Sequence, residues 1–182
     1  MPRIYIVRHG RASASWAEAA DPGLDDQGRA EAEAAARTLA ALPPMPIFSS
    51  PLARARETAA PLERLWETHA RIEPGVAEVP SPDIPLDTRG VWLRALMTGR
   101  WSEADAMRRA WRDNVVATLV RQPRPCAIFS HFVAINVAVG AAEGDDRATL
   151  FSPANGSITI LETDGRTLTL IEKGREAETV VR

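Results

Sequence analysis

The chain has 182 residues, of which 45% are hydrophobic and 25% are charged, values typical of one globular domain. Its formal net charge of -2 gives no bulk attraction to nucleic acid or to an anionic membrane, so neither is expected as a partner. A single cysteine excludes an internal disulfide. The cysteine and the three histidines show no metal-ligand spacing, so no metal or other cofactor is expected. No apolar run is long enough to span a bilayer or to act as a signal peptide, which favours a cytoplasmic protein.

The first predicted element is a short buried strand over residues 3–8, where the apolar run is rich in β-branched residues. A loop that contains Trp16 follows it. Asp25 is expected to cap a helix over residues 26–41, and the prolines that follow end this helix. A second short strand is predicted over residues 47–49.

Pro51 is expected in the first turn of a helix that runs from residue 51 to about residue 68, with a solvated His69 after its end. Four prolines make residues 74–88 irregular. The later predicted elements are helices at 89–98 and 102–121, a strand at 126–130, a helix at 132–142, and a hairpin of 157–162 with 167–172. Strands that alternate with helices predict an α/β fold with a largely parallel central sheet, a C-terminal β-hairpin and a single domain over residues 1–182.

Polar residues suited to binding an anion follow three of the predicted strands. The first strand ends in Arg8-His9-Gly10, the second is followed by Ser50 and Arg54, and the third ends in Ser130-His131. The carboxyl ends of neighbouring parallel strands meet at one edge of a sheet, so we expect these groups to lie together. Arginine has a planar fork of donors for phosphate, histidine can act as nucleophile, acid or base, and glycine lets the backbone approach a ligand closely.

These motifs resemble those of the histidine phosphatase superfamily, in its phosphoglycerate-mutase-like branch. The matching segments are Arg8-His9-Gly10, Asp21-x-x-Leu24 with Gly28 and Ala32, Ser50-Pro51-Leu52-x-Arg54-Ala55-x-x-Thr58-Ala59, Ser130-His131, and Asn155-Gly156-Ser157-Ile158. They cover most of the chain. The resemblance implies the phosphoglycerate-mutase-like fold and a metal-independent phosphomonoester hydrolase.

The resemblance also implies a role for each matching residue. His9 would be an unprotonated nucleophile that forms a phosphohistidine, while Arg8, Arg54 and His131 would bind the phosphoryl oxygens, His131 as a cation. Fixed cations suit this reaction because a phosphoryl group in transfer spreads negative charge over its equatorial oxygens. Three further residues are expected to bind substrate: Gly10, Ser15 and Phe132.

Poor leaving groups need a general acid. Members of this superfamily often carry a carboxylate in the loop after the helix of the second motif, and Glu78 fits that position. Glu73 and Asp83 are rivals nearby. We therefore predict that Glu78 protonates the leaving oxygen.

Departures from the family pattern narrow the activity. Arg11 and Ser15 stand where mutases and bisphosphatases usually carry Glu and Asn, and the chain is short for a mutase lid. Phe132 follows the second histidine, where histidine acid phosphatases typically have Asp. The sequence favours a compact phosphatase. The alternatives are a non-catalytic module that binds phosphate or a phosphoprotein, a phosphohistidine-protein phosphatase and, least favoured, a phosphoglycerate mutase.

Residues 74–124 are a candidate lid or specificity region, because most of this stretch matches no motif. Within it, residues 89–112 are rich in tryptophan and arginine. One interpretation is a pair of amphipathic helices with tryptophans inward and arginines in water. The second is a rim from which Arg89 reaches a second anionic group of a phosphorylated small molecule or phosphoprotein, and the third is a homodimer interface built on exposed tryptophans.

Overall fold

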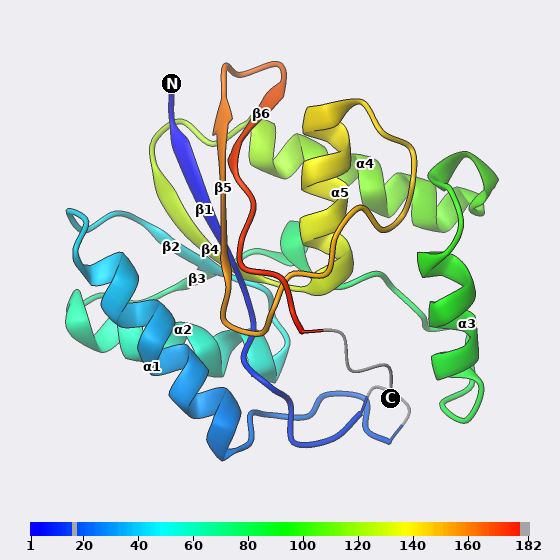
Figure 1. Cartoon of the computed structure of the whole chain (residues 1–182), viewed down its shortest axis with the longest axis horizontal. Coiled ribbons are helices and arrows are strands. Elements are labelled where there is room, and N and C mark those ends of the chain that lie inside the picture. Colours follow the sequence, from blue (N-terminus) through cyan, green and yellow to red (C-terminus); the bar gives the residue numbers. More distant parts are fainter. Residues whose placement is uncertain (16–17, 179–182) are drawn as a thin grey trace.

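A six-stranded sheet organises this structure, a computed structural model that describes residues 1–15 and 18–178 (Figure 1). The strands are β1 (Arg3–Arg8), β2 (Ile47–Ser49), β3 (Arg71–Ile72), β4 (Cys126–Ser130), β5 (Ile158–Thr163) and β6 (Leu168–Glu172). Their order is β3-β2-β4-β1-β5-β6. The first four strands are parallel to one another, β5 is antiparallel to β1, and β6 is antiparallel to β5. The predicted α/β fold, with its largely parallel sheet and C-terminal hairpin, is confirmed.

Five helices and two 3-10 turns accompany the sheet in the part of the chain that the structure describes. They are α1 (Asp26–Ala40), α2 (Ala53–Leu65), the turn η1 (Pro74–Val76), α3 (Arg89–Met97), the turn η2 (Trp101–Glu103), α4 (Ala106–Val120) and α5 (Phe132–Glu143). The two-residue strand β3 was not predicted, because so short a strand has no periodicity to detect. Trp16, in the first predicted loop, lies outside the described residues.

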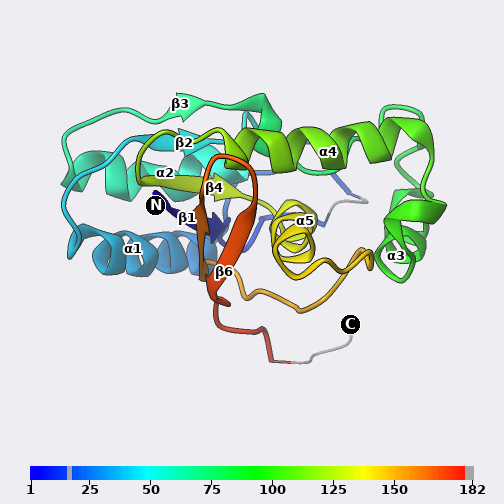
Figure 2. The same ribbon diagram turned by 90° about the horizontal axis from the view of Figure 1, so that it is seen from above.

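Alternating side chains of the central strands build a core on each face of the sheet. Ile4 and Ile6 of β1 pack on the face covered by α4 and α5, while Tyr5 and Val7 pack on the face covered by α1 and α2 (Figure 2). All four are at most 9% exposed. This period of two residues is the one expected of a strand buried on both faces, and it fixes the register that positions the strand ends.

The first residue of a helix can be predicted where the side chain that caps it is adjacent in the sequence. Asp25 caps α1 as predicted, and its side chain accepts a hydrogen bond from Gly28 N at 2.7 Å. The second helix begins at Ala53 rather than at Pro51, because the cap comes from Asp21, whose Oδ1 accepts from Ala53 N at 2.8 Å. A cap supplied from 32 positions away leaves no local signal.

Helix α3 lies apart from the sheet, beyond α4 and α5, in both views (Figures 1 and 2). The tryptophans of this region point inward: Trp101 is 2% exposed, and Trp92 and Trp111 pack against the core. The expectation that the arginines lie in water is wrong for Arg108. Its side chain is only 3% exposed and lies between carboxylates, donating to Asp83 and Asp105.

Three further features complete the fold. Cys126 is fully buried, and burial raises the pKa of its thiol to about 12. Within the described residues, no helix is long and apolar enough to cross a membrane. Residues 174–177 run beside 152–154, joined by backbone hydrogen bonds, so this part of the C-terminus is paired.

Candidate active site

Three neighbouring strands end at the same edge of the sheet and carry the candidate residues. The order β2-β4-β1 is parallel throughout, with Arg8 opposite Ser130 and Ser49 opposite Phe129. His9 follows β1, while the turn after β2 leads to α2, which carries Arg54 in its first turn. The structure therefore brings together the strand-end groups that the sequence separates by more than a hundred positions.

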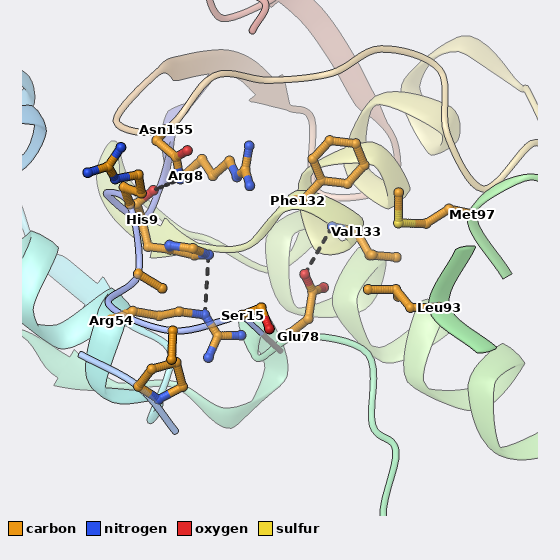
Figure 3. A pocket seen from close by; sticks show the side chains of 14 residues that line it. Arg8, His9, Ser15, Arg54, Glu78, Leu93, Met97, Phe132, Val133 and Asn155 are labelled. Carbon is orange, nitrogen blue, oxygen red and sulfur yellow. Dashed lines mark hydrogen bonds between the residues drawn. The ribbon is translucent and has the colours of Figure 1, made fainter. Parts of the chain in front are cut away.

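The His9 ring is held at both of its nitrogens. Nδ1 lies 2.7 Å from the carbonyl oxygen of Gly10, which can only accept, so Nδ1 carries the proton. Nε2 therefore presents a lone pair, and Arg54 Nε donates to it at 3.2 Å (Figure 3). Burial, Arg8 and Arg54 together lower the pKa of His9 to about 3. A neutral imidazole with a directed lone pair is the form that can attack phosphorus.

Two arginines flank the His9 ring and keep unpaired donors. Arg8 donates from Nη1 to the carbonyl of Pro153 at 2.7 Å, and its guanidinium lies 5.2 Å from the centre of the Phe132 ring. Arg8 Nε and Arg54 Nη1 are buried and have no hydrogen-bond partner among the described residues. Buried donors without partners are costly, and an anion between these arginines would satisfy them.

His131 is completely buried beside His9, with the two ring centres 5.2 Å apart. Its Nε2 lies 2.7 Å from Ser50 Oγ, and its Nδ1 has no partner among the described residues. Burial holds the pKa of His131 well below its ordinary value, and His9, Arg54 and Arg8 lower it further. These surroundings favour the neutral imidazole of His131 in the protein alone, and its action as a cation toward a bound phosphoryl group stays a prediction.

Glu78 faces the same cavity from the segment after η1 (Figure 3). Its Oε1 accepts from Val79 N at 3.1 Å, and its Oε2 accepts from Val133 N, in the first turn of α5, at 3.3 Å. Burial raises the pKa of Glu78 despite these hydrogen bonds and the nearby arginines. A raised pKa is what a carboxyl group needs in order to donate a proton.

The rival carboxylates lie elsewhere. Glu73 accepts from Gly75 N at 2.8 Å and so caps η1. Asp83 pairs with Arg108, and this ion pair lowers the pKa of Asp83. Neither residue lines the cavity.

Gly10 does not line the cavity, in contrast to its expected substrate-binding role. A Cβ atom there would lie 2.3 Å from the carbonyl oxygen of Gly28, and one on Gly28 would lie 2.2 Å from that of Arg11. Gly10 N donates to Thr58 Oγ1 at 2.9 Å, and this hydroxyl donates to the Arg54 carbonyl at 2.6 Å. The glycine therefore lets β1, α1 and α2 approach one another closely.

The cavity has a volume of about 640 Å³, within the range of small-molecule sites. Ser15 and Phe132 line it as predicted candidates, whereas Arg89 does not. Sequence reasoning gave no cavity role to several other lining residues: Arg11, Ala12, Ala14, Pro22, Leu93, Met97, Val133 and Asn155. Asn155 had a signal, since it opens a quoted motif, and its Nδ2 donates to the His9 carbonyl at 3.0 Å.

No group of three or more histidine, cysteine or acidic side chains that could hold a metal ion occurs among the described residues.

Comparisons with known proteins agree with this architecture. The family model for the histidine phosphatase superfamily (branch 1) matches residues 4–174. No curated protein matches the chain in sequence.

Two solved structures illustrate the similarity of fold. A mycobacterial glucosyl-3-phosphoglycerate phosphatase is 23% identical, with a TM-score of 0.71 over 97% of this chain and 100% of that one. A phosphoglycerate mutase from Thermus thermophilus is 21% identical, with a TM-score of 0.60 over 96% of this chain and 99% of that one.

Proposed function

The chain belongs to branch 1 of the histidine phosphatase superfamily, and from this premise we propose that it hydrolyses phosphomonoesters through a phosphohistidine on His9. One observation carries the proposal. The His9 ring is neutral, fixed through Nδ1, and presents Nε2 between two arginines that keep unpaired buried donors.

In the first step, Arg54 Nε shifts its hydrogen bond from His9 Nε2 to a phosphoryl oxygen, and the freed lone pair of Nε2 attacks phosphorus. The bond from phosphorus to the ester oxygen breaks. Glu78 gives its proton to that oxygen, so that a neutral alcohol leaves. Arg8, Arg54 and His131 hold the phosphoryl oxygens, where charge is spread in the transition state.

In the second step, water attacks the phosphorus of the phosphohistidine. The Glu78 carboxylate takes a proton from the water, and the phosphorus–nitrogen bond breaks. Inorganic phosphate leaves, and both His9 and Glu78 return to their starting protonation states. Two steps with separate barriers replace one displacement by water.

Trapping the phosphoenzyme tests this proposal. The protein is mixed with nitrophenyl phosphate in the presence of a chelator, denatured rapidly and digested, and the phosphorylated peptide is identified by mass spectrometry. We expect phosphate on His9, and we expect His9→Ala to abolish both turnover and labelling. His69→Ala is the matched control, because that side chain is 99% exposed. Phosphate binding without turnover would instead show a non-catalytic module.

Residues 74–124 are proposed to act as the specificity region within a single domain, since they supply Glu78, Leu93 and Met97 to the cavity. We propose that the substrates are phosphorylated small molecules and that the protein acts on them in the cytoplasm. A side-by-side screen of phosphorylated metabolites and phosphoproteins tests the first point, and cell fractionation tests the second. Trp101 is buried, and Trp92 and Trp111 are partly buried against the core, so a homodimer interface on exposed tryptophans stays a prediction.

A further inference from the structure

The cavity continues well beyond the groups that face a phosphoryl group. On the far side from His9 its wall is formed by Leu93 and Met97 of α3 and by Phe132 and Val133 of α5 (Figure 3). A volume of about 640 Å³ accommodates a whole small molecule, of which a phosphoryl group is a minor part. This second part of the cavity is where the group esterified to the phosphate would lie.

This wall, which we call the apolar wall, consists of Leu93, Met97, Phe132 and Val133. The first three side chains are only half-buried and expose hydrocarbon to the cavity. Apolar surface in a concave site favours a ligand that covers it with hydrocarbon, at about 25 cal/mol for each Å² removed from water.

Most of the charge around the cavity lies on the side of His9, and Arg8 reaches the apolar wall only where its guanidinium lies 5.2 Å from the centre of the Phe132 ring. The basic lining residues in the described ranges are Arg8, Arg54 and Arg11, and Arg11 forms an ion pair with Asp25. Arg8 and Arg54 face the phosphoryl position beside His9. The carboxyl of Glu78 also lies next to the apolar wall, and it repels a second anion once it is ionised.

We infer that the preferred substrates are phosphate monoesters of uncharged alcohols or phenols whose hydrocarbon part packs against Leu93, Met97 and Phe132. The inference rests on the proposed phosphatase function and narrows its substrate class. It excludes leaving groups that place a carboxylate or a second phosphate at this wall. It also replaces the expectation that Arg89 reaches a second anionic group.

A series of alkyl phosphates from ethyl to hexyl tests the inference, because the leaving oxygens have similar basicity and only the hydrocarbon length changes. We expect kcat/KM to rise by up to about fourfold for each methylene that becomes buried, and by at least about tenfold from ethyl to hexyl. Equal kcat/KM values along the series would overturn the inference and leave the phosphatase function standing.

Failure of the proposed function has a different signature, namely no hydrolysis of any ester in the series. Calorimetric titration with ethylphosphonate and hexylphosphonate then measures binding without chemistry. Tighter binding of the hexyl compound supports the apolar wall even for a protein that does not turn over. Equal binding of the two compounds overturns it.

Variants locate the effect on α3. Leu93→Ala should lower the ratio of the hexyl to the ethyl kcat/KM, and a ratio taken within one variant is insensitive to loss of folded protein. Val91→Ala on the same helix is the control, because Val91 is 64% exposed and does not line the cavity. An unchanged ratio in Leu93→Ala would contradict contact between this wall and the leaving group.

A gain of function completes the test. Met97→Arg should shift the preference toward a second anion. A hexyl phosphate with a terminal carboxylate should be hydrolysed at least about tenfold better, relative to hexyl phosphate, than in the parent protein, as expected of a new charge-assisted pair. Unfolding cannot produce such a gain. An unaltered preference would place the leaving group elsewhere.

Discussion

The ring of His9 is fixed by the Gly10 carbonyl at Nδ1 and by the Arg54 guanidinium at Nε2. The sequence motif around His9 indicated a nucleophile but not how the ring is kept unprotonated. His9 follows β1, whereas Arg54 approaches it from α2, 45 positions later in the chain. Burial together with two neighbouring cations lowers the pKa of His9 to about 3. Burial and the neighbours that flank the ring therefore also keep Nε2 unprotonated at neutral pH.

The depressed pKa of His9 predicts an acid-sensitive fold. Between pH 6.5 and about 3 the unfolded chain protonates this histidine and the folded chain does not, so the free energy of unfolding falls as the pH falls. When the pH is lowered from 7 to 5, the free energy of unfolding should fall by about 2 kcal/mol less in His9→Gln than in the parent protein. Urea unfolding at the two pH values measures this difference.

The exposed histidine His69 provides the control for this measurement. Its side chain is 99% exposed, so His69→Ala should show the acid sensitivity of the parent protein. If His9→Gln showed that same sensitivity, the folded protein would bind a proton at His9 in this range.

Glu78 predicts a dependence on the leaving group. Glu78→Gln keeps the size of the side chain but removes its proton, so alkyl phosphates should lose about 100-fold or more in kcat. Nitrophenyl phosphate, whose leaving group needs no proton, should lose little. Steady-state kinetics measure kcat on both substrates. Equal losses of kcat on the two would exclude Glu78 as the general acid.

At the scale of elements, residues 76–80 form what we call the acid loop, because it carries Glu78. Side chains from β4 and α4 donate to three of its backbone carbonyls: Ser130 Oγ to Val76 O at 2.7 Å, Trp111 Nε1 to Ala77 O at 3.3 Å, and Arg108 Nε to Pro80 O at 3.0 Å. Two residues of the region rich in tryptophan and arginine, Trp111 and Arg108, thus fix the backbone of the acid loop. Arg108 also lies 4.7 Å from the centre of the Trp92 ring, which ties the loop to α3.

This arrangement predicts that Arg108 is a positioning residue for Glu78. Lysine keeps the charge but lacks the planar fork that reaches Pro80 O and Asp83 together, so Arg108→Lys should let the acid loop move. We expect kcat on alkyl phosphates to fall by about tenfold, with a much smaller loss on nitrophenyl phosphate, since general acid–base catalysis contributes at least about 100-fold.

The exposed neighbour Arg109 is the control, because Arg109→Lys should change neither rate. In a Glu78→Gln background, Arg108→Lys should have no further effect on the ratio of the two rates, since the two residues act as one unit. An additive change in this ratio would mean that Arg108 acts independently of Glu78 and would contradict the positioning role.

How far the sequence predicts an element depends on where its determinants lie. The start of α1 was predicted because Asp25 is adjacent to it. Helix α2 starts two residues later than predicted, and the side chain that accepts from its first N–H is Asp21, in the loop before α1. The buried position of Arg108 was missed for the same reason. Helical spacing places it among other arginines, and only the fold shows that Asp83 lies opposite it.

At the scale of the whole molecule, the parallel order β2-β4-β1 gathers groups from the whole length of the chain at one sheet edge. The strand-end groups were predictable because parallel strands share an edge, and their motifs are specific. The apolar wall was not, since Leu93 and Met97 read as ordinary core positions of an amphipathic helix. No pattern in the sequence of α3 indicates that α4 and α5 lie between this helix and the sheet.

The folded molecule also accumulates an electrostatic cost at that edge. Burial lowers the pKa of both Arg8 and Arg54, and these cations lower the pKa of His9 and His131 in turn. Unpaired donors remain on both arginines, and His131 Nδ1 has no hydrogen-bond partner among the described residues. A single bound anion would relieve both the repulsion and the missing hydrogen bonds, so anion binding should be coupled strongly to folding.

Inorganic phosphate should therefore raise the Tm of the protein, by about 5–10 °C at a concentration one hundred times its Kd, equivalent to about 2.7 kcal/mol. Arg54→Ala should abolish most of this shift, whereas Arg109→Ala should keep it, with sodium chloride at equal ionic strength as the solvent control. Thermal unfolding monitored by circular dichroism measures all three proteins. Phosphate can also stabilise proteins by exclusion from their surface, and this effect does not depend on one side chain. Equal shifts in the parent protein and in Arg54→Ala would thus assign the stabilisation to exclusion and contradict an anion site beside His9.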